Sequence, residues 1–594
     1  MSLINFYSSR IEVFQAIFLK LQKKEIRLSV LRLSWFLASL VAFYMLFSVS
    51  VLIASVVLAI GFFSLGWLVK YQNTIIQKKK FNEYLKTINE LELKSLNGDF
   101  YSFPDGSEYH EKDHPYESDL DIFGHASLFQ FVNRTTSQLA GNMLASWLKA
   151  PAPISEIQLR QEAVAELKDL TDWRQQMIAI GYQYKESGNN PEEILMWLKT
   201  PSIFKNITTL RILTVSLSVI SFATAFFVFR GLPFSVLMFV LIVNFWVNYK
   251  YFKAINKFHQ QVTKSCELLK AYSEAIGLIE SQDFHSRQLL ELKSNFFGKE
   301  KASKQIKKLS ELVNRLDTRL NVMVSIPLNL FLFWDIHSSI ALESWKKSFA
   351  PYVSQWFEAM AKVEALSSLA NLQFNNPEWI FPEVKETCFE LNAVEMGHPL
   401  IPANRRVCND FSVDRSGKIV LVTGSNMSGK STFQRTCGVN MVLAFAGAPV
   451  CASKFIVSRV SLYTSMRISD SLEDNTSSFY AELKRLALII KEVESNSKVF
   501  LLLDEILRGT NSNDRHIGSI ALIKQLIQQN ASGIVATHDL SLSSLEQELP
   551  DNIDNYNFDV KINGEELYFD YKLNKGICKS LNASILMKKM GIKV

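Results

Sequence analysis

The longest uninterrupted apolar run of the chain lies near its start. Residues 33–69 contain no charged side chain. As one straight helix this run would be about 55 Å long, whereas the hydrocarbon layer of a membrane is about 30 Å thick. It therefore predicts two short membrane-spanning helices that turn near residues 48–50. Cations flank the run on both sides, which places both ends in the cytoplasm: Lys23, Lys24, Arg27, Arg32, Lys70, Lys78, Lys79 and Lys80.

A second pair of uncharged runs covers residues 212–229 and 232–249, separated by Arg230 and Gly231. Cations flank this pair as well, so we expect a second hairpin with both ends inside. The alternative for either hairpin is a buried helix pair of a large soluble domain, although uncharged stretches of about 18 residues favour a membrane span. A signal peptide is disfavoured because the first run starts late and is too long. Before it, residues 6–21 predict a helix that lies on the membrane surface or in solvent.

In the last third of the chain the pattern changes to short apolar strands followed by polar residues. Residues 419–423 predict a buried strand, and the stretch "TGSNMSGKST" then leads into a helix. The spacing Gly424-x-x-x-x-Gly429-Lys430-Ser431 in this context predicts a P-loop, whose backbone amides surround the phosphates of a nucleotide. Lys430 would reach the β- and γ-phosphates, and Ser431 would hold magnesium. ATP and Mg²⁺ are therefore the expected ligands.

Two further strands carry the side chains that such a loop requires. The strand at residues 499–503 ends in Asp504 and Glu505. Asp504 would hold magnesium, and Glu505 would activate the attacking water. A third strand, in "SGIVATHDLS", ends in His538. A histidine after a strand is more often structural than catalytic, but its place after two nucleotide-binding elements favours a contact with the γ-phosphate.

Composition changes this picture little. A chain of 594 residues is expected to form several domains. The net charge of +6 permits contact with phosphate backbones or anionic lipid without requiring either. Six cysteines without a C-x-x-C pair indicate neither a zinc site nor a disulfide framework. Alternating residues on both sides of Asn563-Gly564 predict a β-hairpin over residues 556–573, at the edge of a sheet.

The combination of motifs resembles the ATPase domain of the MutS family, which belongs to the ABC-type ATPases. "TGSNMSGKST" is followed by "GAPVCA", "SSFYAELKRL", "LLLDEILRGTNSNDR" and "ATHD". Upstream, "LDIFGHASLFQFVNRTTSQLAGNMLASWLKAP" and "RQEAVAEL" resemble the start of the helical core domain of that family. "LNLFLFWDIH", "EALSSLANL" and "HPLI" resemble the connection from its lever helices to the ATPase domain. The resemblance covers residues 117–200 and 255–590.

The resemblance implies an ATP-gated dimer in which two ATPase domains face each other. In the family a serine near an S-x-F-x-x-E motif reaches the γ-phosphate that the opposite subunit holds, and here Ser477 or Ser478 takes that place. The alternative is that these serines only cap a helix, with support from Glu482. Asn426 and Thr432 resemble the family's nucleotide-binding residues in the loop, and residues 511–514 would cross between the two sites.

The chain departs from the mismatch-reading members of the family where their DNA contacts would be. Membrane hairpins replace the domain that carries a Phe-x-Glu wedge. "GDFYSF" at residues 98–103 and "FNE" at residues 81–83 are assigned to structure, because neither has room for a folded module that would aim an aromatic side chain into DNA. The DNA-clamp domain is not evident. A basic run at residues 298–308 is either a solvated helix face or a phosphate-binding surface.

We therefore expect an α/β ABC-type P-loop ATPase domain joined to an all-α lever and core domain with two transmembrane hairpins. The expected segments, in order, are an N-terminal amphipathic segment, hairpin 1, a juxtamembrane linker, core helices, hairpin 2, lever and core helices, and the ATPase domain: 1–32, 33–69, 70–116, 117–205, 206–252, 253–375 and 376–594.

The expected function is that of a multi-pass protein of the cell's inner membrane, with a cytoplasmic ATPase domain, that works as a homodimer. It would bind or remodel DNA near the membrane. The alternative is a mechanochemical or scaffold ATPase that acts on the lipid bilayer or on a membrane protein. An ABC exporter is disfavoured because the L-S-G-G-Q signature is absent from the sequence.

Overall fold

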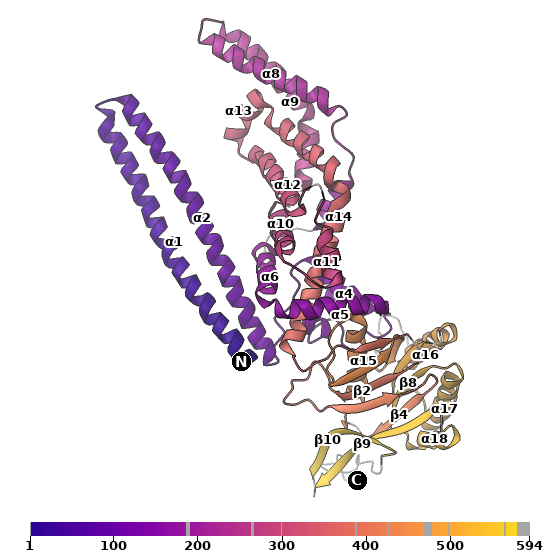
Figure 1. The fold of residues 1–594 in the computed structure, drawn as a ribbon. Helices are drawn as coiled ribbons and strands as arrows, with labels where there is room; N and C mark the ends of the chain where they lie inside the picture. The colour runs from indigo at the N-terminus through magenta and orange to yellow at the C-terminus, as the bar shows by residue number, and fades with distance from the viewer. Residues whose placement is uncertain are drawn as a thin grey trace.

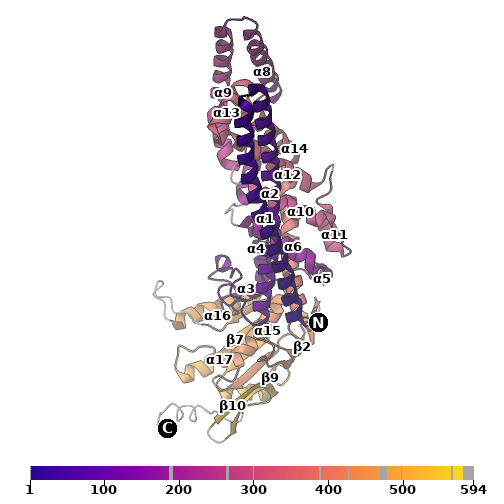
Figure 2. The same ribbon diagram turned by 90° about the vertical axis from the view of Figure 1, so that its left-hand side faces the viewer.

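The protein is elongated, with an α/β part at one end and two helix pairs that point away from it (Figure 1). Figure 2 shows that the turns of both pairs lie toward the same end of the molecule. This computed structural model describes residues 2–185, 191–262, 266–298, 300–386, 389–425, 427–467, 478–496, 498–563 and 566–578. In this part of the chain, four helices are long and apolar enough to cross a membrane.

The first helix pair consists of α1 (Leu3–Phe47) and α2 (Val51–Leu96). The two helices lie close together because small residues line their contact: a Cβ atom on Gly61 would approach Ser39 Oγ to 2.6 Å. Trp35 Nε1 also donates to Ser64 Oγ at 2.7 Å. Both helices run unbroken through residues 32–33 and 69–70, so the expected segment boundaries there mark a change in polarity within continuous helices.

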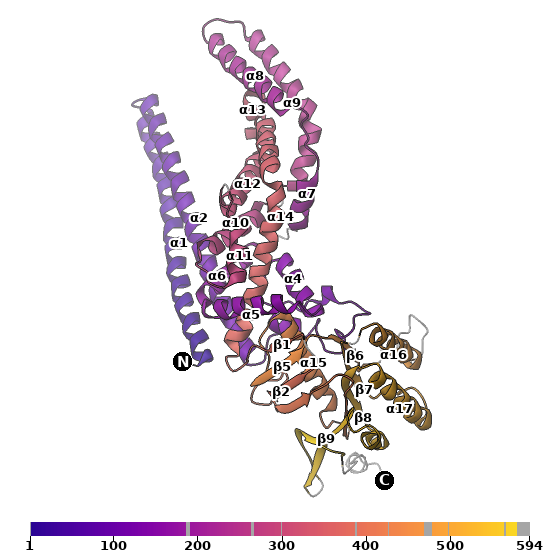
Figure 3. The same cartoon turned by 45° about the vertical axis from the view of Figure 1, so that its right-hand side comes forward.

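The polar ends of this pair dock on the helical core. Tyr7 is fully buried, and its hydroxyl donates to Asn375 Oδ1 at 2.6 Å. Leu85 and Ile88 of α2 pack against Ile178 in a small separate apolar cluster. The apolar half of each helix, in contrast, diverges from the core helices (Figures 1 and 3).

The second pair consists of α8 (Ile207–Val228) and α9 (Phe234–Val262), and the short helix α13 (Val322–Leu332) packs against it. The long helix α14 (Trp334–Asn375) starts beside α13 and reaches the α/β part (Figure 3). The remaining helices form the core around α14: α3 (Leu128–Val132), α4 (Gln138–Lys149), α5 (Ile154–Asp169), α6 (Thr171–Lys185), α7 (Pro191–Lys199), α10 (Cys266–Ser281), α11 (Arg287–Ser294) and α12 (Ala302–Asp317), with short 3₁₀ turns η1 (Ser107–Tyr109) and η3 (Thr318–Leu320).

The α/β part contains a four-stranded sheet of order β1-β5-β2-β3 and a six-stranded sheet of order β10-β9-β4-β8-β7-β6. The first has β1 (Glu383–Lys385), β2 (Leu391–Met396), β3 (Asn409–Val413) and β5 (Lys454–Ser458). The second has β4 (Ile419–Gly424), β6 (Ser461–Ser465), β7 (Val499–Asp504), β8 (Ser532–Thr537), β9 (Ile553–Asn563) and β10 (Glu566–Lys575). Its helices are α15 (Lys430–Ala446), α16 (Ser478–Ser495), α17 (Ser512–Gln528) and α18 (Leu545–Glu548), with the 3₁₀ turn η4 (Leu540–Ser544).

The central strands β4, β7 and β8 are parallel and buried along their whole length, as expected for strands covered by helices on both faces. Alternate residues of β4 point to different cores. Val420 and Val422 belong to the large apolar cluster that continues through α15 into the helical core. Ile419 and Leu421 belong to a second cluster with α16 and α17. One face of the six-stranded sheet therefore shares an apolar interior with the helical core, and the other face has a core of its own.

Several sequence predictions outside the site are confirmed. Strands β9 and β10 form the antiparallel hairpin expected from Asn563-Gly564 and end the sheet. Phe100 and Phe103 are buried, so "GDFYSF" is structural. The basic run lies largely on α12, which buries its apolar side and exposes the lysines, an arrangement that a solvated face and a phosphate-binding surface share: Lys301, Lys304, Lys307 and Lys308. None of the five cysteines that the structure describes is in a disulfide bond.

Candidate active site

The loop between β4 and α15 has the backbone of a phosphate-binding loop. Gly424 and Gly429 both have positive φ angles, 153° and 108°. A Cβ atom on Gly424 would approach the carbonyl oxygen of Phe558 to 2.9 Å, so only glycine fits there. Helix α15 starts at Lys430, and its first amides face the loop. Asn426 lies outside the residues that the structure describes.

Lys430 lies folded over this loop. Its Nζ donates to the carbonyl oxygens of Gly424 and Ser425, at 2.9 and 3.0 Å. Burial lowers the pKa of Lys430, which Asp504 and Glu505 partly counteract. The buried ammonium group of Lys430 is hydrogen-bonded to backbone carbonyl oxygens. It is therefore well placed to exchange these bonds for stronger ones to phosphate oxygens.

Ser431 and Asp504 come together from α15 and β7. Ser431 Oγ donates to Asp504 Oδ2 at 2.6 Å. A hydroxyl and a carboxylate at the start of such a helix are hard oxygen ligands of the kind that Mg²⁺ prefers. In the described part of the chain, no group of three or more His, Cys, Asp or Glu side chains could hold a metal. The pair would supply two oxygen ligands to a magnesium ion, and water and phosphate oxygens would supply the others.

Glu505 lies at the centre of a charged cluster. Its Oε1 is 2.7 Å from His538 Nε2, and its Oε2 is 3.2 Å from Arg508 Nε. The hydrogen bond to His538 lowers the pKa of Glu505, so the carboxylate is ionised near neutral pH. His538 Nε2 is also 3.3 Å from Lys430 Nζ. The structure thus brings three predicted site residues, Lys430, Glu505 and His538, together with Arg508, and Ser431 and Asp504 lie beside them.

The loop after β7 is held in an unusual backbone conformation. Glu505 and Leu507 have positive φ angles of 50° and 60°, which L-residues rarely adopt. Glu482 of α16 is buried, and its carboxylate accepts hydrogen bonds from the amides of Leu507 and Arg508. Phe479 packs on the same loop, where a Cβ atom on Gly509 would approach Phe479 Cβ to 2.5 Å.

The S-x-F-x-x-E motif therefore has a role that the sequence analysis did not assign: its Phe and Glu position the loop that carries Glu505. Helix α16 starts at Ser478, whereas Ser477 lies outside the described residues. Arg508 was also not singled out. The signal was its spacing of four residues from Asp504, and its NH2 group is 3.5 Å from Asp504 Oδ2. Residues 511–514 form a helix cap, in which Asn511 Oδ1 accepts from Asp514 N at 2.9 Å.

Replacing Glu482 with alanine is expected to lower the free energy of unfolding by about 2 kcal/mol, because two backbone amides lose a charged acceptor. Chemical denaturation followed by circular dichroism measures this loss. Glu494→Ala, at an exposed position of the same helix, is the matched control and should change stability little. Equal stability of the two variants would contradict the assigned role of Glu482.

A cavity of about 380 Å³ opens beside the loop. Its polar lining includes His398, Arg405, Asn409, Thr432 and Tyr571. Burial, helped by Arg435, lowers the pKa of His398 to about 4, so its imidazole is neutral. Asn409 Nδ2 donates to the carbonyl oxygen of Tyr571 at 3.1 Å, which ties the edge strand β10 to this wall. The cavity adjoins Gly429 and Ser431, where a nucleoside attached to bound phosphates would lie.

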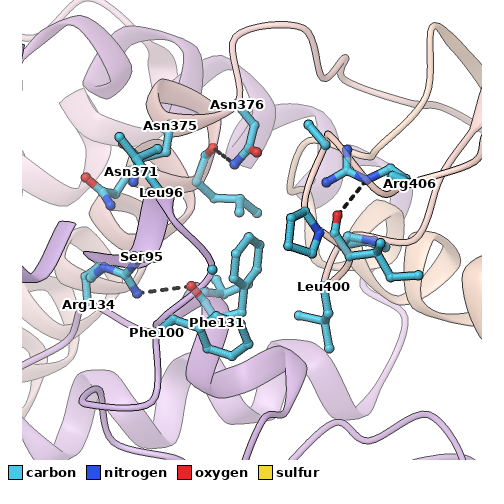
Figure 4. A pocket seen from close by; sticks show the side chains of 17 residues that line it. Ser95, Leu96, Phe100, Phe131, Arg134, Asn371, Asn375, Asn376, Leu400 and Arg406 are labelled. Atoms are coloured by element: carbon cyan, nitrogen blue, oxygen red, sulfur yellow. Dashed lines mark hydrogen bonds between the residues drawn. The ribbon is translucent and has the colours of Figure 1, made fainter. Parts of the chain in front are cut away.

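A second cavity, of about 250 Å³, lies behind the same wall (Figure 4). Its lining comes from the end of α2, from the end of α14 and from the loop at residues 399–406. Ile401 lines both cavities. One loop thus separates the candidate nucleotide pocket from the base of the first helix pair.

A buried polar network joins the helices beside this second cavity. Glu92 of α2 pairs with Arg134 through Nε at 2.5 Å and accepts from the amides of Asn371 and Asn375 of α14, at 3.0 and 2.8 Å. Elsewhere, Asp119 accepts from the backbone amides of Met466 and Arg467, at 3.1 and 2.8 Å. The first network joins α2 to α14 within the helical part, and the second contact binds the helical part to the α/β part.

Comparison with known proteins places this site in a family. The family model "MutS domain V" matches residues 420–590. The "DNA mismatch repair protein MutS" of Thermotoga maritima is 33% identical over 225 residues, which are 37% of this chain and 27% of that protein. The protein of the same name from Finegoldia magna is 30% identical over 303 residues, 50% of this chain and 33% of the relative. "MutS protein homolog 4" of Homo sapiens is 30% identical over 217 residues, 34% of this chain and 22% of the relative.

In each of these comparisons the matched part is a third or less of the relative's length. The residues that the family model matches contain the candidate phosphate-binding loop, the strand that ends in Asp504 and the strand that precedes His538. The C-terminal part of the chain, residues 420–590, therefore matches domain V of the MutS family.

Proposed function

We propose that this chain is a membrane-anchored ATPase of the MutS family that works as an ATP-gated homodimer. One observation carries the proposal: Ser431 lies 2.6 Å from Asp504, directly beside the cluster of Lys430, Glu505 and His538. These are the groups that phosphoryl transfer to water requires, and they meet at the carboxyl ends of parallel strands.

In the proposed reaction the loop amides and Lys430 bind the β- and γ-phosphates of ATP. Ser431 and Asp504 would hold Mg²⁺, and the ion would supply positive charge against the phosphate oxygens. Glu505 accepts a proton from the attacking water. His538 contacts the Glu505 carboxylate and orients it for this role. Arg508 contacts the side-chain carboxylates of both Asp504 and Glu505 and thereby fixes the distance between these two carboxylates.

Dimerisation would complete the site. Ser478, the first residue of α16, and Ser477, which lies outside the described residues, are our candidates for the contact with the γ-phosphate of the opposite subunit. Since Glu482 and Phe479 of the same helix hold the loop of Glu505, closure of the dimer would act on the catalytic base through α16. ATP binding would favour the closed state and hydrolysis the open one.

The proposed anchor consists of α1–α2 and α8–α9, whose apolar halves point away from the ATPase part. Cations flank both hairpins on the ATPase side, which favours a cytoplasmic ATPase at the cell's inner membrane. The loop that contains Ile401 would transmit nucleotide binding to the base of the first hairpin, because it borders both cavities.

Two kinds of target are compatible with the proposed ATPase, and its target is called its load: DNA, or the membrane with its proteins. DNA is favoured by the relatives, whose names describe DNA mismatch repair, and by the row of exposed lysines on α12. The membrane, or a protein in it, is the second candidate. It is favoured by the buried network that ties the first hairpin to α14 beside the candidate nucleotide pocket.

The ATPase rate of the full-length protein in lipid nanodiscs distinguishes the two loads. It should be measured with duplex, branched and mismatched DNA over a range of salt concentrations. For a DNA load, we expect stimulation that weakens steeply as salt increases, because bound counterions are released. A rate that ignores all DNA but changes with lipid composition would assign the load to the membrane. Absence of hydrolysis under every condition would contradict the proposed function itself.

A further inference from the structure

The short helix α13 combines two properties that rarely occur together in a soluble protein. It is apolar on all sides, with the sequence VMVSIPLNLFL. Yet none of its eleven residues, all of which the structure describes, is buried. Met323 is 90% exposed, Val322 64% and Ile326 54%. A continuous exposed apolar surface of this kind marks a contact with a protein or with lipid.

Its position indicates the contact. α13 packs against the second helix pair, where the rings of Phe331 and Phe222 are 5.7 Å apart. The amide of Asn244 in α9 donates to the carbonyl oxygen of Leu330 at 2.7 Å, and Asn248, one turn further, donates to that of Asn329 at 2.9 Å. α13 is therefore bonded to a helix that is long and apolar enough to cross a membrane.

These two hydrogen bonds provide donors for carbonyl oxygens at the end of a helix, where lipid provides none. The last carbonyls of a helix lack partners within the helix, and the bilayer interior offers no water to replace them. α13 ends at Phe333, whose φ of 50° breaks the helix before α14 starts. At this end the side-chain amide of Asn244 is bonded to the carbonyl of Leu330, and that of Asn248 supplements the bond from the backbone amide of Phe333 to the carbonyl of Asn329. The buried Asn244 also donates to Ser221 Oγ of α8 at 2.7 Å, so the three helices are joined by side-chain hydrogen bonds.

Neighbouring residues place α13 at the edge of the hydrocarbon layer. Trp246 and Tyr249 of α9 are both 62% exposed, and Lys250 follows them, as is typical of a membrane interface. They lie on the same turns of α9 as the two asparagines. Charged residues flank α13 on both sides. Arg319 precedes it, Asp335 follows it, and the two side chains form an ion pair at 3.5 Å.

We infer that α13 is a third membrane-embedded element, which enters the bilayer beside the α8–α9 hairpin without crossing it. Eleven residues span only about 16 Å, against about 30 Å for the hydrocarbon layer. The occupant of its exposed face is lipid acyl chains, because that face continues the apolar surface of α8 and α9. This inference rests on the proposed membrane anchor, but not on ATP hydrolysis or on DNA.

The inference gives the lever helix a direct attachment to the membrane. Only Phe333 separates α13 from α14, and Asn329 Oδ1 accepts from the backbone amide of Asp335 at 2.9 Å, which fixes the angle between them. The other end of α14 carries Asn371 and Asn375, next to the cavity in Figure 4. A single helix would therefore connect an element in lipid to the wall of the candidate nucleotide pocket.

Spin labels test this placement in the full-length protein reconstituted in lipid nanodiscs, with the label background of the unsubstituted protein subtracted. Met323→Cys reports on α13, Val219→Cys on the exposed face of α8, and Leu290→Cys on α11 in the helical core. We expect the label at position 323 to resemble that at 219: oxygen accessibility several-fold higher, and accessibility to a water-soluble nickel chelate several-fold lower, than at position 290.

A water-accessible label at position 323 with a lipid-exposed label at 219 would overturn the inference and leave the membrane anchor intact. Water accessibility at both positions would overturn the anchor and the inference together. A label at position 323 that is shielded from both probes would assign the face to a protein partner, such as a second copy of the chain, and would also overturn the inference. The ATPase rate of each labelled protein reports separately on the proposed reaction.

Discussion

Replacing Glu505 with glutamine is expected to slow ATP hydrolysis by roughly 100- to 10,000-fold, the usual contribution of a general base. The amide keeps the size of the side chain but cannot accept a proton from water. Lys430, Ser431 and Asp504, the proposed phosphate and magnesium ligands, are unchanged, so ATP binding should persist. Since hydrolysis is the step that reopens the proposed dimer, the variant should accumulate in a closed, ATP-bound form. Phosphate release and light scattering measure the two effects.

The pH dependence provides a further check on this base. Its hydrogen bond to His538 lowers the pKa of Glu505, so the carboxylate loses its charge only at a pH below the ordinary range of glutamate. The hydrolysis rate should therefore not titrate with Glu505 near neutral pH. Glu494→Gln, at an exposed position of α16, is the matched control for the Glu505→Gln substitution. Normal turnover of the Glu505→Gln protein would show that another group activates the water.

The sequence alone was sufficient to predict the parts of the candidate site that lie on strands and at the start of a helix. Glycine spacing, an apolar strand and a following helix constrain the phosphate loop locally, so Gly424, Gly429 and Lys430 could be placed without knowledge of the rest of the fold. Asp504 and His538 follow buried strands, and parallel strands end at the same edge of a sheet. Their proximity therefore follows from topology that the apolar runs already indicate.

Contacts that depend on packing between elements could not be read in this way. Glu482 looked like a helix-capping residue, whereas the structure uses it to hold the backbone of Leu507 and Arg508, 25 and 26 residues further along the chain. The boundaries at residues 32–33 and 69–70 were drawn at changes of polarity. A helix continues through such a change because its backbone hydrogen bonds do not depend on whether the side chains meet lipid or water.

The short helix α13 shows the same limit for the membrane part. Eleven apolar residues are too few to predict a membrane span, and in a soluble protein such a run usually fills a core. Only its packing beside α9, with Asn244 and Asn248 bonded to its last carbonyls, distinguishes the two cases.

Replacing Lys430 with alanine is expected to weaken ATP binding by about 100-fold or more. Removal of one partner from a buried charge pair costs about 2–5 kcal/mol, and each 1.4 kcal/mol is about a tenfold change in the dissociation constant. No other described cation is as close to the carbonyl oxygens of Gly424 and Ser425, where the phosphates are expected. Titration with a fluorescent ATP analogue measures the change.

Loss of folding would not explain such a result. Burial lowers the pKa of Lys430, which means that the folded protein bears a cost for keeping this charge. Alanine removes that cost together with two hydrogen bonds, so the unfolding temperature should change little. Lys454→Ala, at an exposed position of β5, controls for the loss of a positive charge. Unchanged ATP affinity of the Lys430→Ala protein would mean that the phosphates bind elsewhere. Glu505 would then lie beside the wrong loop, and the proposed reaction would fail with it.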